Sequence, residues 1–113
     1  MNKIGSFQSK RWGKVDVYRT TYGAADGPCA IPLTIGGAPL ATLSVNMYRP
    51  ECSQDSRDLP ADCFYVKEWA VNETLAPEAF ASGLFILRDD LPRASSGYVT
   101  APVWQIKDAG GAS

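Results

Sequence analysis

Runs of strand-forming residues separated by turn residues constrain this chain more than any other feature of its sequence. Residues 38–47 and 63–69 are rich in apolar, β-branched and aromatic side chains, and we expect them to form paired strands. Residues 14–20 alternate apolar and polar side chains, which is typical of a half-buried strand. Gly36-Gly37 indicates a hairpin, because a tight turn needs positive φ angles. The expected strands are residues 14–20, 29–35, 40–47, 63–69, 84–88 and 98–107, and we expect Pro102 to break the last of them.

A single segment, residues 72–83, has the signals of a helix. Asn72 or Thr74 can cap its start, Pro77 suits the first turn and Gly83 can end it. The apolar stripe that we expect to pack on the sheet is Leu75, Ala79 and Phe80. This order of elements predicts an α+β fold, with a mostly antiparallel sheet of about five to six strands and one short helix after the fourth strand.

The chain length of 113 residues indicates a single domain over residues 1–113. We expect a basic N-terminal segment at residues 1–13, a folded core at residues 14–107 and a flexible tail at residues 108–113. Residues 48–62 form a long polar stretch with two prolines. Loops of this length in compact domains are often functional or mobile, so this loop is a candidate for binding.

Charge is unevenly distributed, although the net charge is only −1. Residues 1–19 are mostly basic and residues 51–68 are mostly acidic, so the two regions could attract different partners. The simpler interpretation, that both are solvated faces, stays open. A protein that binds nucleic acid over its whole surface would be clearly basic, and a DNA mimic would be strongly acidic. The balance of charge argues against both classes.

The residues of common catalytic and metal sites are scarce. The chain has no histidine, so a nucleophile–histidine pair is excluded, and zinc would need carboxylates or a second chain. The adjacent acids Asp89 and Asp90 lie in an expected turn, where solvation is the usual outcome. We therefore expect no enzyme, no cofactor and no small-molecule substrate. The three cysteines, which we expect to be reduced, are Cys29, Cys52 and Cys63.

No targeting or membrane segment is evident in the sequence. The first residues lack the apolar stretch of a signal peptide, and no apolar run approaches the ~20 residues of a membrane helix. These observations predict a cytoplasmic protein with no membrane partner. Among the aromatic side chains, Trp69 and Tyr65 fit a buried central strand, whereas Tyr22 and Tyr48 lie in loops and are more suited to binding.

Two motifs, residues 39–46 (PLATLSVN) and residues 64–73 (FYVKEWAVNE), give the chain a family resemblance. Over roughly residues 14–107 it resembles a group of short proteins of unknown function encoded on plasmids, conjugative elements and phages. Ser44 and the long acidic loop depart from that pattern. The resemblance implies an accessory function on a mobile genetic element, and small proteins of this kind include anti-CRISPR proteins, which bind a Cas effector.

Our leading hypothesis from the sequence is therefore an anti-CRISPR inhibitor that binds a bacterial CRISPR–Cas effector complex. Such effectors hold nucleic acid in positively charged channels, which an acidic surface could occupy. The expected partner-binding residues are Asp55, Asp58, Asp62, Glu68 and Glu73, with Tyr48 as an apolar anchor. The alternative is a plasmid or phage accessory protein that binds nucleic acid through Arg11 and Lys14 beside Trp12.

Overall fold

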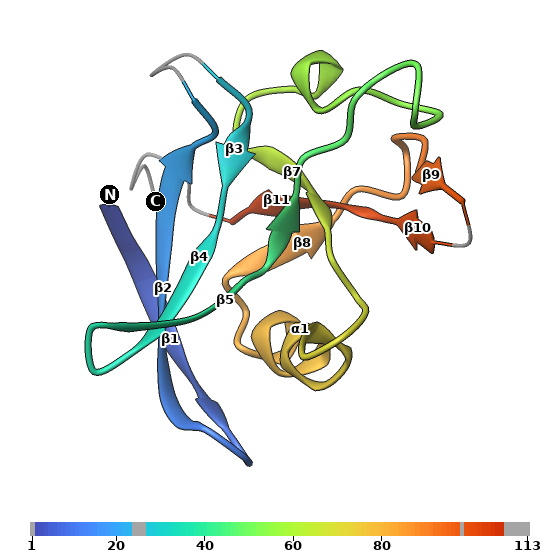
Figure 1. Cartoon of the computed structure of the whole chain (residues 1–113). Helices are drawn as coiled ribbons and strands as arrows, with labels where there is room; N and C mark the ends of the chain where they lie inside the picture. Colours follow the sequence, from blue (N-terminus) through green and yellow to red (C-terminus); the bar gives the residue numbers. More distant parts are fainter. Residues whose placement is uncertain (1, 24–26, 98, 108–113) are drawn as a thin grey trace.

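The computed structural model describes residues 2–23, 27–97 and 99–107 and has mostly antiparallel strands with one α-helix among those residues (Figure 1). The first sheet has the order β1-β2-β4-β5, with β3 also paired to β2. The alternation predicted for residues 14–20 is confirmed, because Val15 and Val17 are completely buried on one face of β2. The strands of this sheet are β1 (Asn2–Ser9), β2 (Gly13–Thr21), β3 (Cys29–Ala30), β4 (Pro32–Ile35) and β5 (Ala38–Thr42).

A second sheet has the order β6-β7-β11-β8, and a separate ribbon pairs β9 with β10. All of these pairs are antiparallel. The loop before β7 contains one 3₁₀ turn, η1 (Ser56–Asp58), and the connection after β7 leads into helix α1 (Asn72–Ala81). The strands are β6 (Ser44–Val45), β7 (Cys63–Val66), β8 (Phe85–Leu87), β9 (Ala94–Ser96), β10 (Val99–Ala101) and β11 (Val103–Ile106).

Leu43 joins the two larger sheets. Its N–H donates to the carbonyl oxygen of Ile31 at 2.8 Å, and its own carbonyl oxygen accepts from the N–H of Lys67 at 2.8 Å. The predicted strand at residues 40–47 is therefore divided at Leu43 into β5 and β6, which belong to different sheets. Backbone hydrogen bonding continues through Leu43, so the strands of the two sheets form one continuous series from β1 to β8. We call this curved series of strands the curled strand path.

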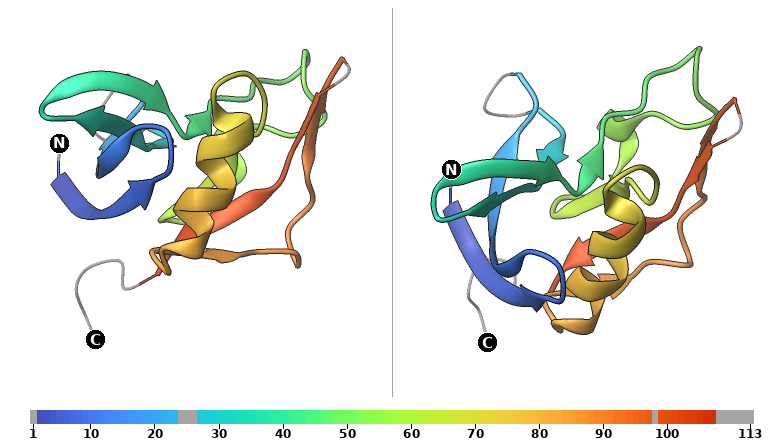
Figure 2. Two further views of the ribbon diagram at one scale, coloured as in Figure 1. Left: turned by 90° about the horizontal axis from the view of Figure 1, so that it is seen from below. Right: turned by 60° about the horizontal axis from the view of Figure 1, so that its bottom comes forward.

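Helix α1 packs between the two ends of this path, in contact with both β1 and β8 (Figure 2). Glu78 accepts hydrogen bonds from the hydroxyl of Ser9 and from the N–H of Lys10, each at 2.8 Å. At the other end of the helix, the side-chain amide of Asn72 donates to the carbonyl oxygen of Thr42 at 2.8 Å. The helix is thus fixed to the first sheet at both of its ends.

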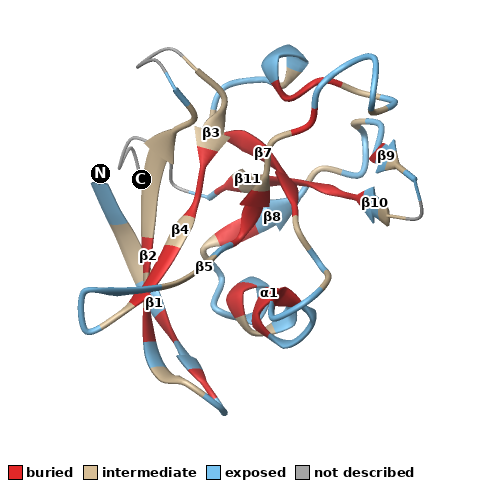
Figure 3. Cartoon of the chain, in the orientation of Figure 1, coloured by how far each residue is buried: buried red, intermediate tan, exposed pale blue. Residues whose placement is uncertain are grey.

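The interior contains two apolar clusters, one on each face of β7, and every residue of that strand is buried (Figure 3). The larger cluster lies between the sheets and α1, where the rings of Phe64 and Phe85 meet edge to face with centroids 5.5 Å apart. The smaller cluster lies on the opposite face around Tyr65 and Val103. The prediction that residues 63–69 include a central strand is correct for Cys63–Val66.

Several element predictions differ from the structure. The segment at residues 1–13, which was expected outside the folded core, supplies β1, and Phe7 from this strand is buried in the larger cluster. The predicted break of the last strand at Pro102 is confirmed, whereas β9 was missed. The strands also exceed the predicted five to six. The expected tail at residues 108–113 lies outside the described residues.

Within the part of the chain that the structure describes, no helix has the length and apolar character needed to cross a membrane.

Candidate functional site

An exposed groove lies where α1 meets the four-stranded sheet, and we call it the α1 groove. Its volume is about 400 Å³. Phe80 is 40% exposed and Leu87 is 44% exposed, whereas Trp104 is buried at the floor. The rings of Phe80 and Trp104 lie 5.0 Å apart between centroids, so the helix and β11 together shape the groove. The lining residues are Glu68, Pro77, Phe80, Leu87, Arg93, Pro102 and Trp104.

A second hollow adjoins the α1 groove on the side of the turn that follows β8, and we call it the turn hollow. Its volume is about 280 Å³. Leu87, Arg93 and Pro102 line both depressions, so the two share one boundary. Leu91 and Pro92 add apolar surface to the hollow, and Arg88 and Asp89 also line it. The groove and the hollow therefore form one continuous strip of concave, largely apolar surface.

Three charged side chains on this strip are unpaired. Glu68 lines only the α1 groove, Asp89 lines only the turn hollow, and Arg93 lines both. All three residues are exposed, and none of them forms an ion pair with another described residue. Their charges are therefore available to a partner. Of the six predicted partner-binding residues, Glu68 is the one that the structure places here.

Asp55 does not have the exposed position that the sequence hypothesis needed. The residue is buried and caps η1: its carboxylate accepts from the N–H of Arg57 at 2.9 Å and from the Arg57 guanidinium at 3.0 and 2.7 Å. These bonds, first those from the Arg57 side chain, hold the pKa of Asp55 well below its usual range. Asp55 therefore organises the polar loop, and its carboxylate is not free for a partner.

The other two loop acids that were predicted to bind a partner also lie beside arginines of the same chain. Asp58 is exposed and lies 3.8 Å from a guanidinium nitrogen of Arg49, and Asp62 forms a half-buried ion pair with Arg19. Asp55 and Asp62 are therefore paired with arginines within the chain and Asp58 lies near one, whereas the exposed Glu51 forms no ion pair with another described residue. Figure 1 shows this loop and α1 at opposite ends of the four-stranded sheet, and Glu68 lines the groove beside α1, so the loop acids and Glu68 do not form one acidic surface.

The two remaining predicted residues are exposed. Tyr48 is 53% exposed, and its hydroxyl accepts a hydrogen bond from the side-chain amide of Asn46 at 2.7 Å. Glu73 lies in the first turn of α1, where its negative charge complements the helix dipole. Neither side chain lines the α1 groove or the turn hollow. The structure therefore leaves Tyr48 and Glu73 available for binding but does not bring them together with Glu68 in one depression.

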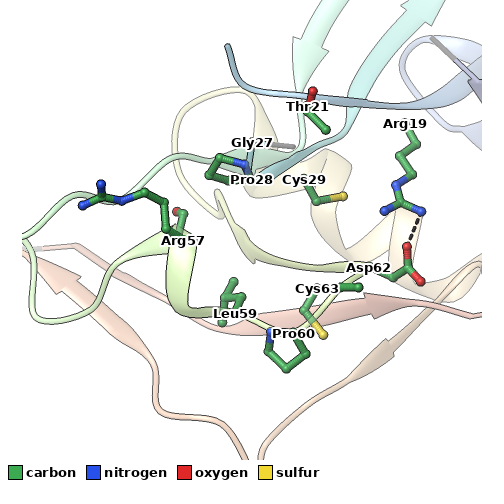
Figure 4. Close-up of a pocket in the computed structure, with 12 residues that line it drawn as sticks. Arg19, Thr21, Gly27, Pro28, Cys29, Arg57, Leu59, Pro60, Asp62 and Cys63 are labelled. Carbon is green, nitrogen blue, oxygen red and sulfur yellow. Dashed lines mark ion pairs between the residues drawn. The ribbon is translucent and has the colours of Figure 1, made fainter. Parts of the chain in front are cut away.

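The largest of these depressions is a cleft of about 590 Å³ between the ends of the two sheets (Figure 4). The side chains of Arg19 and Asp62 point toward one another across it. Cys29 and Cys63 also line the cleft, and burial raises the pKa of both thiols, which disfavours their reactive thiolate forms. Because its arginines are already paired with acids, we regard this cleft as a weaker candidate than the α1 groove.

No group of three or more histidine, cysteine, aspartate or glutamate side chains is placed to hold a metal ion among the described residues.

The turn between β1 and β2 presents the basic residues of the alternative hypothesis. Lys10, Arg11 and Lys14 are exposed and form no ion pair with other described residues. The Arg11 guanidinium lies 4.9 Å from the centre of the Trp12 ring, as in a cation–π contact. Arg11 therefore contacts Trp12 in the turn between β1 and β2, and Lys14 lies next to this turn at the start of β2.

Comparisons of the chain with protein-family models, with curated proteins and with solved structures find no significant match.

Sequence reasoning missed the main apolar residues of the α1 groove. Phe80 was expected to pack on the sheet beside Leu75 and Ala79, yet only the latter two are completely buried. Leu87 belongs to an uninterrupted apolar run, residues 84–87, in which no alternation separates a buried face from an exposed one. The sequence did contain one signal of this exposed surface: residues 84–87 supply more apolar side chains than one short strand can bury.

Proposed function

We propose that this protein is a non-enzymatic inhibitor of the anti-CRISPR type, encoded by a mobile genetic element. In this proposal it binds a bacterial CRISPR–Cas effector complex and blocks the binding or cleavage of target DNA. The α1 groove is its docking surface. The partner class comes from the family resemblance, and the role of the groove comes from the structure.

The observation that carries the proposal is the exposure of Phe80 and Leu87 beside the floor formed by Trp104. Apolar side chains that line a concave surface and remain in contact with water favour association with another protein. Aromatic residues in such depressions commonly contribute a large share of binding energy. A protein that acts by covering another surface needs such a patch, whereas the paired charges of the polar loop provide much less attraction.

The unpaired acids support an effector as the partner. Glu68 at the groove and Asp89 at the turn hollow can approach the basic surfaces with which effectors hold nucleic acid. The structure thus moves the proposed contact away from Asp55, Asp58 and Asp62, whose charges are matched internally. Glu73 and Tyr48 remain proposed contacts at the periphery.

The test is to add the purified protein to guide-loaded effectors of each CRISPR type and to measure target-DNA binding at several salt concentrations. Leu87→Asp should weaken inhibition by about tenfold or more, because it places a charge in the apolar groove. Ile86→Asp is the matched control, since Ile86 is 40% exposed on the same strand but does not line the groove. Equal effects of the two changes, or no complex with any effector at low salt, would refute the proposal.

The alternative function, nucleic-acid binding by an accessory protein, is favoured by one observation: the exposed basic turn with Arg11 above Trp12. A truncation of residues 1–13 cannot test it, because that deletion removes β1 and the buried Phe7. The double change Arg11→Ala and Lys14→Ala affects only exposed residues. A gel shift with single- and double-stranded DNA tests this function: binding by the wild type that this change abolishes would support it, and no binding would refute it.

A further inference from the structure

We propose that the α1 groove and the turn hollow together bind one continuous segment of the partner protein, which carries two apolar side chains and a basic residue beyond each of them. This inference rests on the proposed function and specifies the chemistry of the segment that the docking surface recognises.

The geometry of the strip indicates two apolar anchors. The groove and the hollow, at about 400 and 280 Å³, are separate depressions on either side of a shared boundary. That boundary includes Leu87 and Pro102. Each depression has apolar walls, so each can remove one apolar side chain of a partner from water. Because the depressions are contiguous, a single segment can fill both.

The unpaired charges along the strip indicate which charged residues the partner segment carries. From groove to hollow the unpaired charges run acid, base, acid, because Glu68 lines only the groove, Arg93 lines both depressions and Asp89 lines only the hollow. Arg88 also lines the hollow, but its guanidinium is paired with Asp90. A complementary segment therefore has basic residues at its two outer positions and an acidic or neutral residue between the apolar anchors. The two outer bases match the basic character of surfaces that bind nucleic acid.

The same charge order argues against other occupants. In a twofold dimer whose axis passes through the shared boundary, Arg93 would face its own copy and Glu68 would face Asp89, so the unpaired charges would meet charges of the same sign. Nucleic acid would bring its phosphates toward the two unpaired acids. A basic and apolar protein segment is the occupant that satisfies all three charges.

The experiment uses the full chain and synthetic peptides. Each probe peptide has two leucines separated by a short spacer that contains glutamate, with a lysine beyond each leucine, and the control peptides exchange lysine and glutamate. Binding is followed by the NMR signals of Leu87, Arg93 and the Trp104 indole. We expect the probe set to shift these signals and the control set to bind about tenfold more weakly.

The double change Glu68→Lys and Asp89→Lys should reverse this preference, and both positions are exposed, so the variant can be compared in the folded state. Equal binding of the two peptide sets, or binding of neither, would overturn the inference. The effector assay with Leu87→Asp distinguishes failure of the single-segment inference from failure of the proposed function. If the effector binds and that change weakens it while no peptide binds, then the single-segment inference is wrong and the proposed function stands.

Discussion

Asp55 shows how one side chain can organise a loop that otherwise has little apolar surface to bury. Its carboxylate accepts from the backbone and guanidinium of Arg57, and these contacts lower its pKa. Because the pKa is lower in the folded state, the ionised carboxylate stabilises the fold above the ordinary aspartate pKa of about 4. That contribution is lost as the pH falls from about 4 through the folded-state pKa.

Asp55→Asn should therefore lower the melting temperature at neutral pH, and the difference from the wild type should shrink as the pH falls below about 4. The measurement is thermal unfolding by circular dichroism at pH 7 and at acid pH. Asp58→Asn is the control, since Asp58 is exposed and its distance to Arg49 is 3.8 Å. A wild-type-like melting temperature for Asp55→Asn at neutral pH would show that this contact is not formed in solution.

At the residue scale, the sequence could predict the charge of the loop but not where that charge is neutralised. Asp62 and Arg19 are far apart in the chain, and their pairing depends on the packing of the two sheets. Phe80 is a similar case. The sequence placed Phe80 in the buried stripe of α1, but in a helix this short the stripe is narrow, and the structure leaves this residue at its border exposed.

At the element scale, β1 is the clearest departure from the sequence prediction, and Phe7 tests its importance. Phe7→Ala should destabilise the fold by about 3 kcal/mol, because it leaves a cavity in the larger cluster. For a domain of this size the melting temperature should fall by about 10 °C or more. Gln8→Ala on the same strand is exposed and should change it little. Equal melting temperatures for Phe7→Ala and the wild type would place β1 outside the cooperative core.

The attachment of α1 to the first sheet gives a second prediction at this scale. Glu78→Ala removes the acceptor for the Ser9 hydroxyl and the Lys10 N–H, and should destabilise the fold by about 1–3 kcal/mol. Glu73→Ala on the same helix is the comparison, because Glu73 is exposed and forms no ion pair with another described residue. Chemical denaturation measures both. Indistinguishable unfolding midpoints for these two variants would contradict the role of Glu78.

Local patterns predicted most strands because alternation, Gly36-Gly37 and Pro102 act over a few residues. They failed for β1, since its sequence is mostly polar and only Phe7 and Ser9 are buried in it. They also failed for the break at Leu43. Apolar and polar residues alternate without interruption from Thr42 to Met47, so the sequence gives no sign that the two halves of residues 40–47 join different sheets. That division depends on the curl of the whole strand path.

At the scale of the whole molecule, the arrangement of the curled strand path and α1 creates the strip formed by the α1 groove and the turn hollow. This strip is exposed, largely apolar and lined by three unpaired charged side chains. None of this surface could be derived from the sequence, because its lining comes from α1, β8, β11 and the segments beside them. The expectation of a surface-binding protein therefore stays a prediction, but its proposed contact moves from the acidic loop to the groove.

The most direct test of the central claim is the affinity of the protein for guide-loaded CRISPR–Cas effectors, measured by biolayer interferometry for the wild type, Leu87→Asp and Ile86→Asp. The account predicts a complex with at least one effector, weakened about tenfold or more by Leu87→Asp and little by Ile86→Asp. Absence of a complex with every effector, or equal affinity of the wild type and Leu87→Asp, would contradict it.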